Sequence, residues 1–210
     1  MATKKTLSAF LDDLASNSPA PGGGSVAALA GALGAALAAM VCNLTIGKKK
    51  YSAVEEEMKK ILVQAEAMRG LFTALIDKDT EAFNKVMEAF GLPKDTEPQK
   101  ALRFAAIREA TKEATMVPLE VMKHCIDALA LVQQVAASGN VNSVSDAGVS
   151  AYMLNAAVES AALNVRINLN NLNDSEFVGW KTDEMESLRN TSRMMLEEIQ
   201  GIVSDKLKHD

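Results

Sequence analysis

The sequence predicts an all-α protein: a single bundle of about six helices over residues 1–210, dimerising, with a buried Ala/Gly-rich central helix. Apolar residues recur at helical spacing along almost the whole chain. No segment alternates apolar and polar residues between turn signals, as a half-buried strand does. No internal repeat or low-complexity linker divides the 210 residues, and a hydrophobic content of 48% is enough for one core.

Local start and stop signals support each helix in turn. Ser52 is a suitable cap for the third helix, and the capping box Thr96-Glu97-Pro98-Gln99 starts the fourth, in which Pro118 predicts a kink. Ser143 or Ser145 is expected to cap the fifth. The expected helices cover about residues 7–14, 26–46, 52–90, 97–138, 143–171 and 174 onward.

The second of these helices has the composition of a core element. Residues 18–47 carry no charge, and residues 26–41 are entirely Ala, Leu, Gly, Val and Met. Its length would suit a membrane span, but Ala and Gly contribute little to insertion, so we expect a helix buried in a soluble bundle. Small residues at fourfold spacing, such as Ala27, Gly31 and Ala35, let neighbours approach closely, which favours packing against a second subunit.

Composition excludes several functions. The net charge of −5 and pI near 5.2 argue against a duplex nucleic-acid binder, and the 4% aromatic content argues against a single-strand binder. Two Cys and two His, His124 and His209, are too few for a zinc framework, so no metal is expected. Cysteine usage is that of a reducing cytoplasm, and no signal peptide is recognised.

Two segments are the strongest candidates for chemistry. The loop Gly22-Gly23-Gly24-Ser25 opens a helix, where unpaired N–H groups can bind an anion or a carbonyl oxygen; alternatively it is a tight connection with Ser25 as N-cap. Asp79 lies in the apolar register of its helix, seven residues from Phe72 and from Val86. A core-facing carboxylate is functional or is satisfied by Lys or Asn partners, and both possibilities stay open.

Three further polar groups have weaker signals. Asp146 ends the Ser/Gly/Asn loop that begins at Ser138, where it either complements a helix dipole or contacts a ligand. The lysines 48–50 are either a solvated cluster or a site for an anionic tail. The Asn-rich segment from Asn164 to Asn173 is either a frayed helix end or part of a site.

Taken together and in order, these segments resemble the cyclodeaminase/cyclohydrolase family of folate enzymes over nearly the whole chain. The most specific motif is the Pro-Gly-Gly-Gly-Ser loop that opens an uncharged helix. The matching segments are 18–28, 40–41, 44–45, 47–49, 75–83, 92–94, 117–119, 139–146 and 164–169.

The resemblance implies an all-α dimer and a formimidoyltetrahydrofolate cyclodeaminase, as in histidine degradation. Such an enzyme converts 5-formimidoyltetrahydrofolate to 5,10-methenyltetrahydrofolate and ammonia. Stand-alone members include methenyltetrahydrofolate cyclohydrolases, which are the alternative, and a non-catalytic folate binder is the third possibility. Tetrahydrofolate is itself the substrate carrier, so no other cofactor is implied. The implied partners are folate, a second copy of the chain and, as an open alternative, a separate formiminotransferase; nucleic acid and membrane are not implied.

The resemblance also assigns roles to residues of this chain. Asp79 is implied as the catalytic carboxylate, which relays a proton and stabilises a cationic amidine. The implied substrate-binding residues are Gly22, Gly23, Gly24, Ser25, Lys48, Lys49, Asn140, Asp146 and Asn164. Of these, Lys48 and Lys49 suit the glutamate tail of folate.

Overall fold

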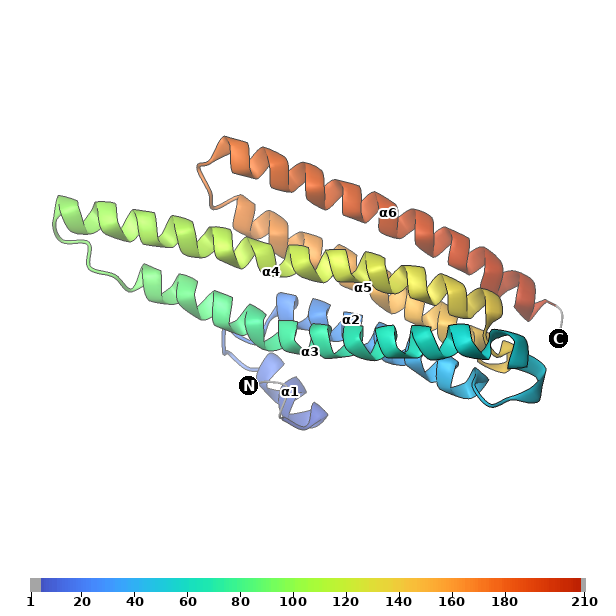
Figure 1. The fold of residues 1–210 in the computed structure, drawn as a ribbon. Helices are drawn as coiled ribbons and strands as arrows, with labels where there is room; N and C mark the ends of the chain where they lie inside the picture. The colour runs from blue at the N-terminus through green and yellow to red at the C-terminus, as the bar shows by residue number, and fades with distance from the viewer. Residues whose placement is uncertain (1–4, 209–210) are drawn as a thin grey trace.

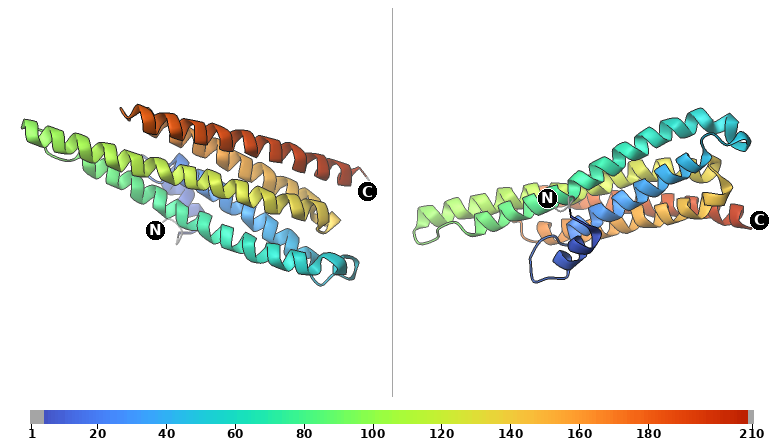
Figure 2. Two further views of the ribbon diagram at one scale, coloured as in Figure 1. Left: turned by 45° about the horizontal axis from the view of Figure 1, so that its top comes forward. Right: turned by 90° about the horizontal axis from the view of Figure 1, so that it is seen from below.

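The computed structural model describes residues 5–208, which form a bundle of six α-helices without a strand in that range (Figure 1). The all-α prediction is confirmed. The long helices α3 and α4 form a hairpin whose tip extends beyond the other helices, while short α1 lies against one side of the bundle (Figures 1 and 2). The elements are α1 (Leu7–Leu14), α2 (Gly23–Thr45), the 3-10 helix η2 (Lys49–Val54), α3 (Glu55–Phe90), α4 (Glu97–Ser138), the 3-10 helix η3 (Val141–Ser143), α5 (Val144–Leu169) and α6 (Ser175–Leu207).

The helix ends confirm some sequence signals and correct others. Thr96 and Gln99 form the predicted capping box, and the Asp174 side chain caps α6. Ser52 is not a cap, because η2 continues the chain to Val54 before α3 begins. Ser143 takes the N-cap position of α5 without a capping hydrogen bond, since its hydroxyl donates to the carbonyl of Asn140. Helix α4 runs through Pro118 without a break.

Helix α2 occupies the middle of the bundle, in contact with α3, α4 and α5. A Cβ on Gly31 would lie 2.6 Å from the ring of Phe72, and one on Gly34 would lie 2.6 Å from Leu154, so glycine is required for both approaches. The helix is long and apolar enough to cross a membrane, but 61% of its most apolar window is buried inside the molecule. The prediction of a buried central helix is confirmed for most of its surface, while Val26, Leu33 and Met40 stay exposed on one side.

The sides of α2 and α5 that no helix covers carry an apolar face. We define this face by exposed Val26, Leu33 and Met40 on α2 and by exposed Val149, Tyr152, Leu163 and Ile167 on α5. The α2 members are spaced seven residues apart, which places them on one side of the helix. Solvent exposure of a row of large apolar side chains is typical of an interaction surface.

Candidate active site

The first turn of α2 packs directly on the carboxylate of Asp79 from α3. A Cβ on Gly24 would lie 2.0 Å from Asp79 Oδ1 and 2.6 Å from its Cγ, so any other residue at position 24 would displace the carboxylate. The hydroxyl of Ser25 donates to Asp79 Oδ2 at 2.9 Å. The glycine loop and Asp79, which are 54 residues apart in the chain, therefore form one local unit.

Asn164 of α5 lies on the other side of the same turn. A Cβ on Gly23 would lie 3.4 Å from Asn164 Nδ2 and 3.5 Å from its Oδ1, so that amide packs against the backbone of α2. Its Nδ2 donates to the carbonyl of Ser160 at 2.9 Å. The start of α2, whose N-cap is Gly22, is thus flanked by Asp79 and by Asn164. We call these residues (Gly22–Ser25, Asp79 and Asn164) the amino-end cluster.

Position within the helix corrects one expectation about Ser25. The helix begins at Gly23 and its N-cap is Gly22, so Ser25 is the third helical residue rather than the cap. Its side chain has no exposed area, and its hydroxyl points across to α3. The predicted contact between Ser25 and a substrate therefore stays a prediction, while its contact with Asp79 is direct.

Electrostatics make Asp79 a suitable proton acceptor. Burial raises the pKa of the Asp79 carboxyl above its ordinary value, and hydrogen bonds from Ser25 partly oppose this shift. Among residues 5–208, no lysine or arginine forms an ion pair with Asp79; the adjacent Lys78 pairs with Glu120 at 2.6 Å instead. The carboxylate is therefore not the satisfied member of a structural ion pair. A partly buried carboxylate with a raised pKa is suited to general acid–base work near neutral pH.

The other predicted binding residues lie at the opposite end of α2. Asn140 donates from its backbone N–H to Thr45 Oγ1 at 2.9 Å and from Nδ2 to the Leu44 carbonyl at 2.8 Å. Tyr51 donates to Asn140 Oδ1 at 3.3 Å and accepts from the backbone N–H of Val141 at 3.0 Å. Sequence reasoning did not assign Tyr51 a role, because only the tertiary structure places its hydroxyl here.

Three predicted charged residues lie close in sequence to the members of this hydrogen-bonded corner. Lys48 and Lys49 are exposed at the start of η2, and Asp146 is partly buried in the first turn of α5. We call Lys48, Lys49, Tyr51, Asn140 and Asp146 the carboxyl-end cluster. Because α2 has 23 residues, the two clusters are separated by about 35 Å along the helix axis at 1.5 Å per residue. One chain does not bring all the predicted site residues together.

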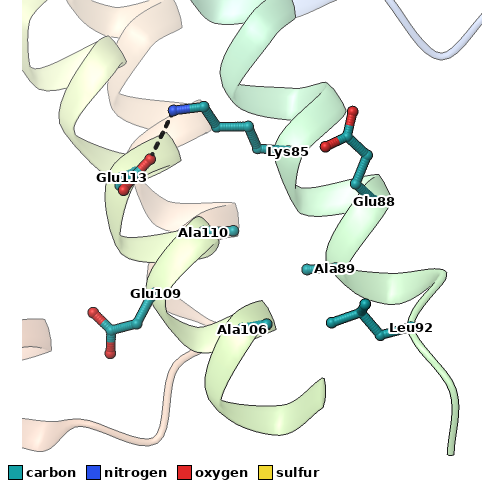
Figure 3. Close-up of a pocket in the computed structure, with 8 residues that line it drawn as sticks. All are labelled: Lys85, Glu88, Ala89, Leu92, Ala106, Glu109, Ala110 and Glu113. Carbon is teal, nitrogen blue, oxygen red and sulfur yellow. Dashed lines mark hydrogen bonds and ion pairs between the residues drawn. The ribbon is translucent and has the colours of Figure 1, made fainter. Parts of the chain in front are cut away.

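Other parts of the molecule contribute little to this arrangement. A hollow of about 420 Å³ lies between α3 and α4 near the tip of their hairpin, and it contains none of the predicted site residues (Figure 3). His124 packs edge-on against Phe72, and His209 lies outside the described residues. Within the described part of the chain, no group of three or more His, Cys, Asp or Glu residues is arranged to hold a metal ion.

Comparisons with known proteins agree with the sequence motifs. A family model described as formiminotransferase-cyclodeaminase matches residues 6–187. A methenyltetrahydrofolate cyclohydrolase from Methylorubrum extorquens is 47% identical over 99% of this chain and 100% of its own length. The formimidoyltransferase-cyclodeaminase of Mus musculus is 36% identical over 82% of this chain, and the match spans 32% of the mouse protein.

A solved structure shows the same fold. The crystal structure of formiminotetrahydrofolate cyclodeaminase from Thermotoga maritima has a TM-score of 0.88 and 32% sequence identity to this chain, covering 99% of it and 100% of that protein. The match therefore includes α1 and α6 as well as the central helices. The chain belongs to the formiminotransferase-cyclodeaminase family, the cyclodeaminase/cyclohydrolase family of folate enzymes that its motifs resemble.

Proposed function

We propose that this protein is a methenyltetrahydrofolate cyclohydrolase, which interconverts 5,10-methenyltetrahydrofolate and 10-formyltetrahydrofolate. The observation that carries this choice is the 47% identity to a cyclohydrolase over the full length of both chains. The sequence motifs alone favour the cyclodeaminase first and this reaction second. That order is reversed because the full-length relative is more similar than the formimidoyltransferase-cyclodeaminases, at 47% against 34–37%.

The amino-end cluster can carry out this hydrolysis with the groups that it contains. The bridging carbon of methenyltetrahydrofolate belongs to a cationic amidine, and the Asp79 carboxylate stabilises such a cation. Water attacks this carbon while Asp79 accepts a proton from the water. The bond from the carbon to N5 then breaks, N5 takes a proton, and the formyl group remains on N10. One proton is released overall, and the N–H groups at the start of α2 can stabilise the oxygen of the tetrahedral intermediate.

The second candidate is the cyclodeaminase, favoured by the structural match to the Thermotoga maritima enzyme. In that reaction N10 attacks the formimidoyl carbon, Asp79 accepts the N10 proton and passes it to the amino group on that carbon, and the amino group leaves as ammonia. Both reactions pass through a tetrahedral carbon next to the same carboxylate. In either case we expect tetrahydrofolate to serve as the substrate carrier, with no further cofactor, because only proton transfers are needed.

The experiment that decides between them follows both products. Purified protein is incubated with methenyltetrahydrofolate and, separately, with 5-formimidoyltetrahydrofolate, while methenyl absorbance and ammonia are measured. We expect loss of methenyl absorbance with the first substrate. Ammonia release with the second substrate alone would assign the cyclodeaminase. No turnover of either, with folate still bound, would favour the non-catalytic binder.

An Asp79→Asn variant tests the role of the carboxylate in the same assay. The amide cannot accept a proton at neutral pH, so we expect at least a hundredfold loss of turnover in a protein that remains folded. A fully active Asp79→Asn protein would remove Asp79 from the mechanism.

A homodimer would reconcile the two separated clusters. Leu33 lies near the middle of α2 on the apolar face, so a two-fold axis there would bring the amino-end cluster of one chain to the carboxyl-end cluster of its partner. Leu33→Glu should then yield an inactive monomer, whereas Val63→Glu, on the exposed side of α3, should leave the dimer active. An active Leu33→Glu monomer would contradict this assembly.

The remaining assignments follow from the proposed reaction. We propose a cytoplasmic location, where folates are available, and Lys48 and Lys49 as contacts of the glutamate tail. If ammonia release is observed, a separate formiminotransferase is the expected supplier of substrate, and co-purification would test that association.

A further inference from the structure

The hydroxyl group of Ser25 has a position that packing alone does not require. The side chain is fully buried, and its oxygen lies 2.9 Å from Asp79 Oδ2, 3.4 Å from the Ile76 carbonyl and 3.5 Å from Thr80 Oγ1. All three of these atoms belong to α3, whereas Ser25 belongs to α2. The hydroxyl therefore bonds to a neighbouring helix and not to its own.

We propose that Ser25 is a positioning residue, which holds the Asp79 carboxyl group in one place while that group gains and loses the proton of the reaction. This inference rests on the proposed function, because it assigns a task to Ser25 only if Asp79 transfers protons.

The surroundings of the hydroxyl provide a partner in both protonation states. When Asp79 is ionised, Ser25 donates to Oδ2 at the observed 2.9 Å. When Asp79 carries a proton on Oδ2, the Ser25 oxygen can accept a hydrogen bond from that O–H. Ser25 then turns its own hydrogen toward the Ile76 carbonyl, 3.4 Å away. When the proton is on Oδ1, the original bond to Oδ2 remains. In each of these states the Ser25 hydroxyl has a partner on α3, so it can hold the carboxyl group in one place.

The opposite side of the carboxyl group is fixed by the backbone. Gly24 lies so close to Oδ1 that the position of a Cβ there would be 2.0 Å from that oxygen. Asp79 is therefore held between the Gly24 backbone and the Ser25 hydroxyl. The hydrogen bonds from Ser25 also lower the pKa of Asp79 against the effect of burial.

The test is an Asp79 titration in Ser25→Ala, read in two ways. Carboxyl carbon NMR, with Asp79→Asn for assignment, gives the pKa of Asp79 without any need for activity. The pH dependence of kcat/KM gives it during turnover. We expect both to shift upward by about one to two units in Ser25→Ala, because one hydrogen bond to a charged group is lost.

Ser150→Ala is the matched control. Ser150 of α5 is also fully buried and also donates to a neighbouring helix, to the Gly34 carbonyl of α2 at 2.7 Å, far from Asp79. We expect it to lose stability to a similar extent while the Asp79 titration stays unchanged. If Ser25→Ala does not fold, Ser25→Cys fills the same space with a weak donor and should show the same direction of shift.

Two outcomes separate this inference from the proposed function. An unchanged Asp79 pKa in folded Ser25→Ala or Ser25→Cys would overturn the positioning role even in an active enzyme. Absence of turnover in the wild-type protein would overturn the proposed function, and the positioning role with it, although the NMR shift would still report the hydrogen bond.

Discussion

The two ends of α2 differ in how their polar groups are satisfied. At the amino end, a carboxylate from α3 is buried against a glycine backbone with a single hydroxyl donor, and burial raises its pKa. At the carboxyl end, Thr45, Tyr51 and Asn140 satisfy one another. The lysines at 48–50 form no ion pair among the described residues. At the amino end, burial therefore disfavours the ionised form of the Asp79 carboxyl. At the carboxyl end, the polar groups are hydrogen-bonded to each other and the lysines are exposed to solvent. The difference separates residues that would react from residues that would bind.

The largest expected effect comes from Gly24→Ala, which places a Cβ where the Asp79 carboxylate now packs. The new Cβ would require Asp79 to move, since the present separation from Oδ1 would be 2.0 Å. A displacement of about 1 Å is expected to lower kcat about a hundredfold. Steady-state kinetics and circular dichroism measure activity and fold together. Gly70→Ala, where a Cβ would meet nothing within 4 Å, is the control and should remain fully active. An active Gly24→Ala enzyme would show that the close approach has no catalytic importance.

Next in size is Asn140→Ala at the carboxyl end. The change removes the bond from Nδ2 to the Leu44 carbonyl and the acceptor of Tyr51, so we expect a loss of about 2 kcal/mol in the free energy of unfolding. Urea denaturation measures it. A raised KM in an equally stable protein would instead support the predicted contact between Asn140 and the substrate.

A smaller effect, of opposite sign, is expected from Asp79→Asn on stability. The pKa of Asp79 in the folded chain lies above its ordinary value of 3.8, so at pH values between the two the folded chain retains a proton that the unfolded chain has lost. Stability from this group is therefore present at low pH and falls as pH rises through the raised pKa. The variant should be more stable than the wild type above the raised pKa and equally stable below the ordinary pKa. Denaturation curves at several pH values test this, with exposed Asp205→Asn as the neutral control.

The smallest effect is expected from Lys48→Ala combined with Lys49→Ala. Both side chains are exposed, so stability should change by less than about 0.5 kcal/mol. KM for a polyglutamylated folate should rise about fivefold at low salt, and the difference should shrink at high salt through screening. The exposed Lys94, in the turn between α3 and α4, provides the control substitution. Equal KM values in the double variant and the wild type would leave these lysines without a binding role.

Local signals predicted the helices well and their first residues less well. The Thr96 capping box and the Asp174 cap depend on side chains that reach their own backbone, so they can be recognised in the sequence. Ser52 and Ser25 are of a residue type that often caps helices, but neither of them caps one here. Contacts with other elements decide those positions, and Ser25 bonds to α3 because the glycines let the helices meet there.

The sequence by itself determined the all-α class, the buried central helix and the anomaly of Asp79 in an apolar register. Helical periodicity and composition are local properties, and they depend on nothing beyond neighbouring residues. Only the tertiary structure decided that Asp79 meets Gly24 and Ser25, and that Asn140 closes the far end of the same helix. Residues more than 50 positions apart in the chain come together because helices pack side by side, and the resulting burial raises the pKa of the Asp79 carboxyl.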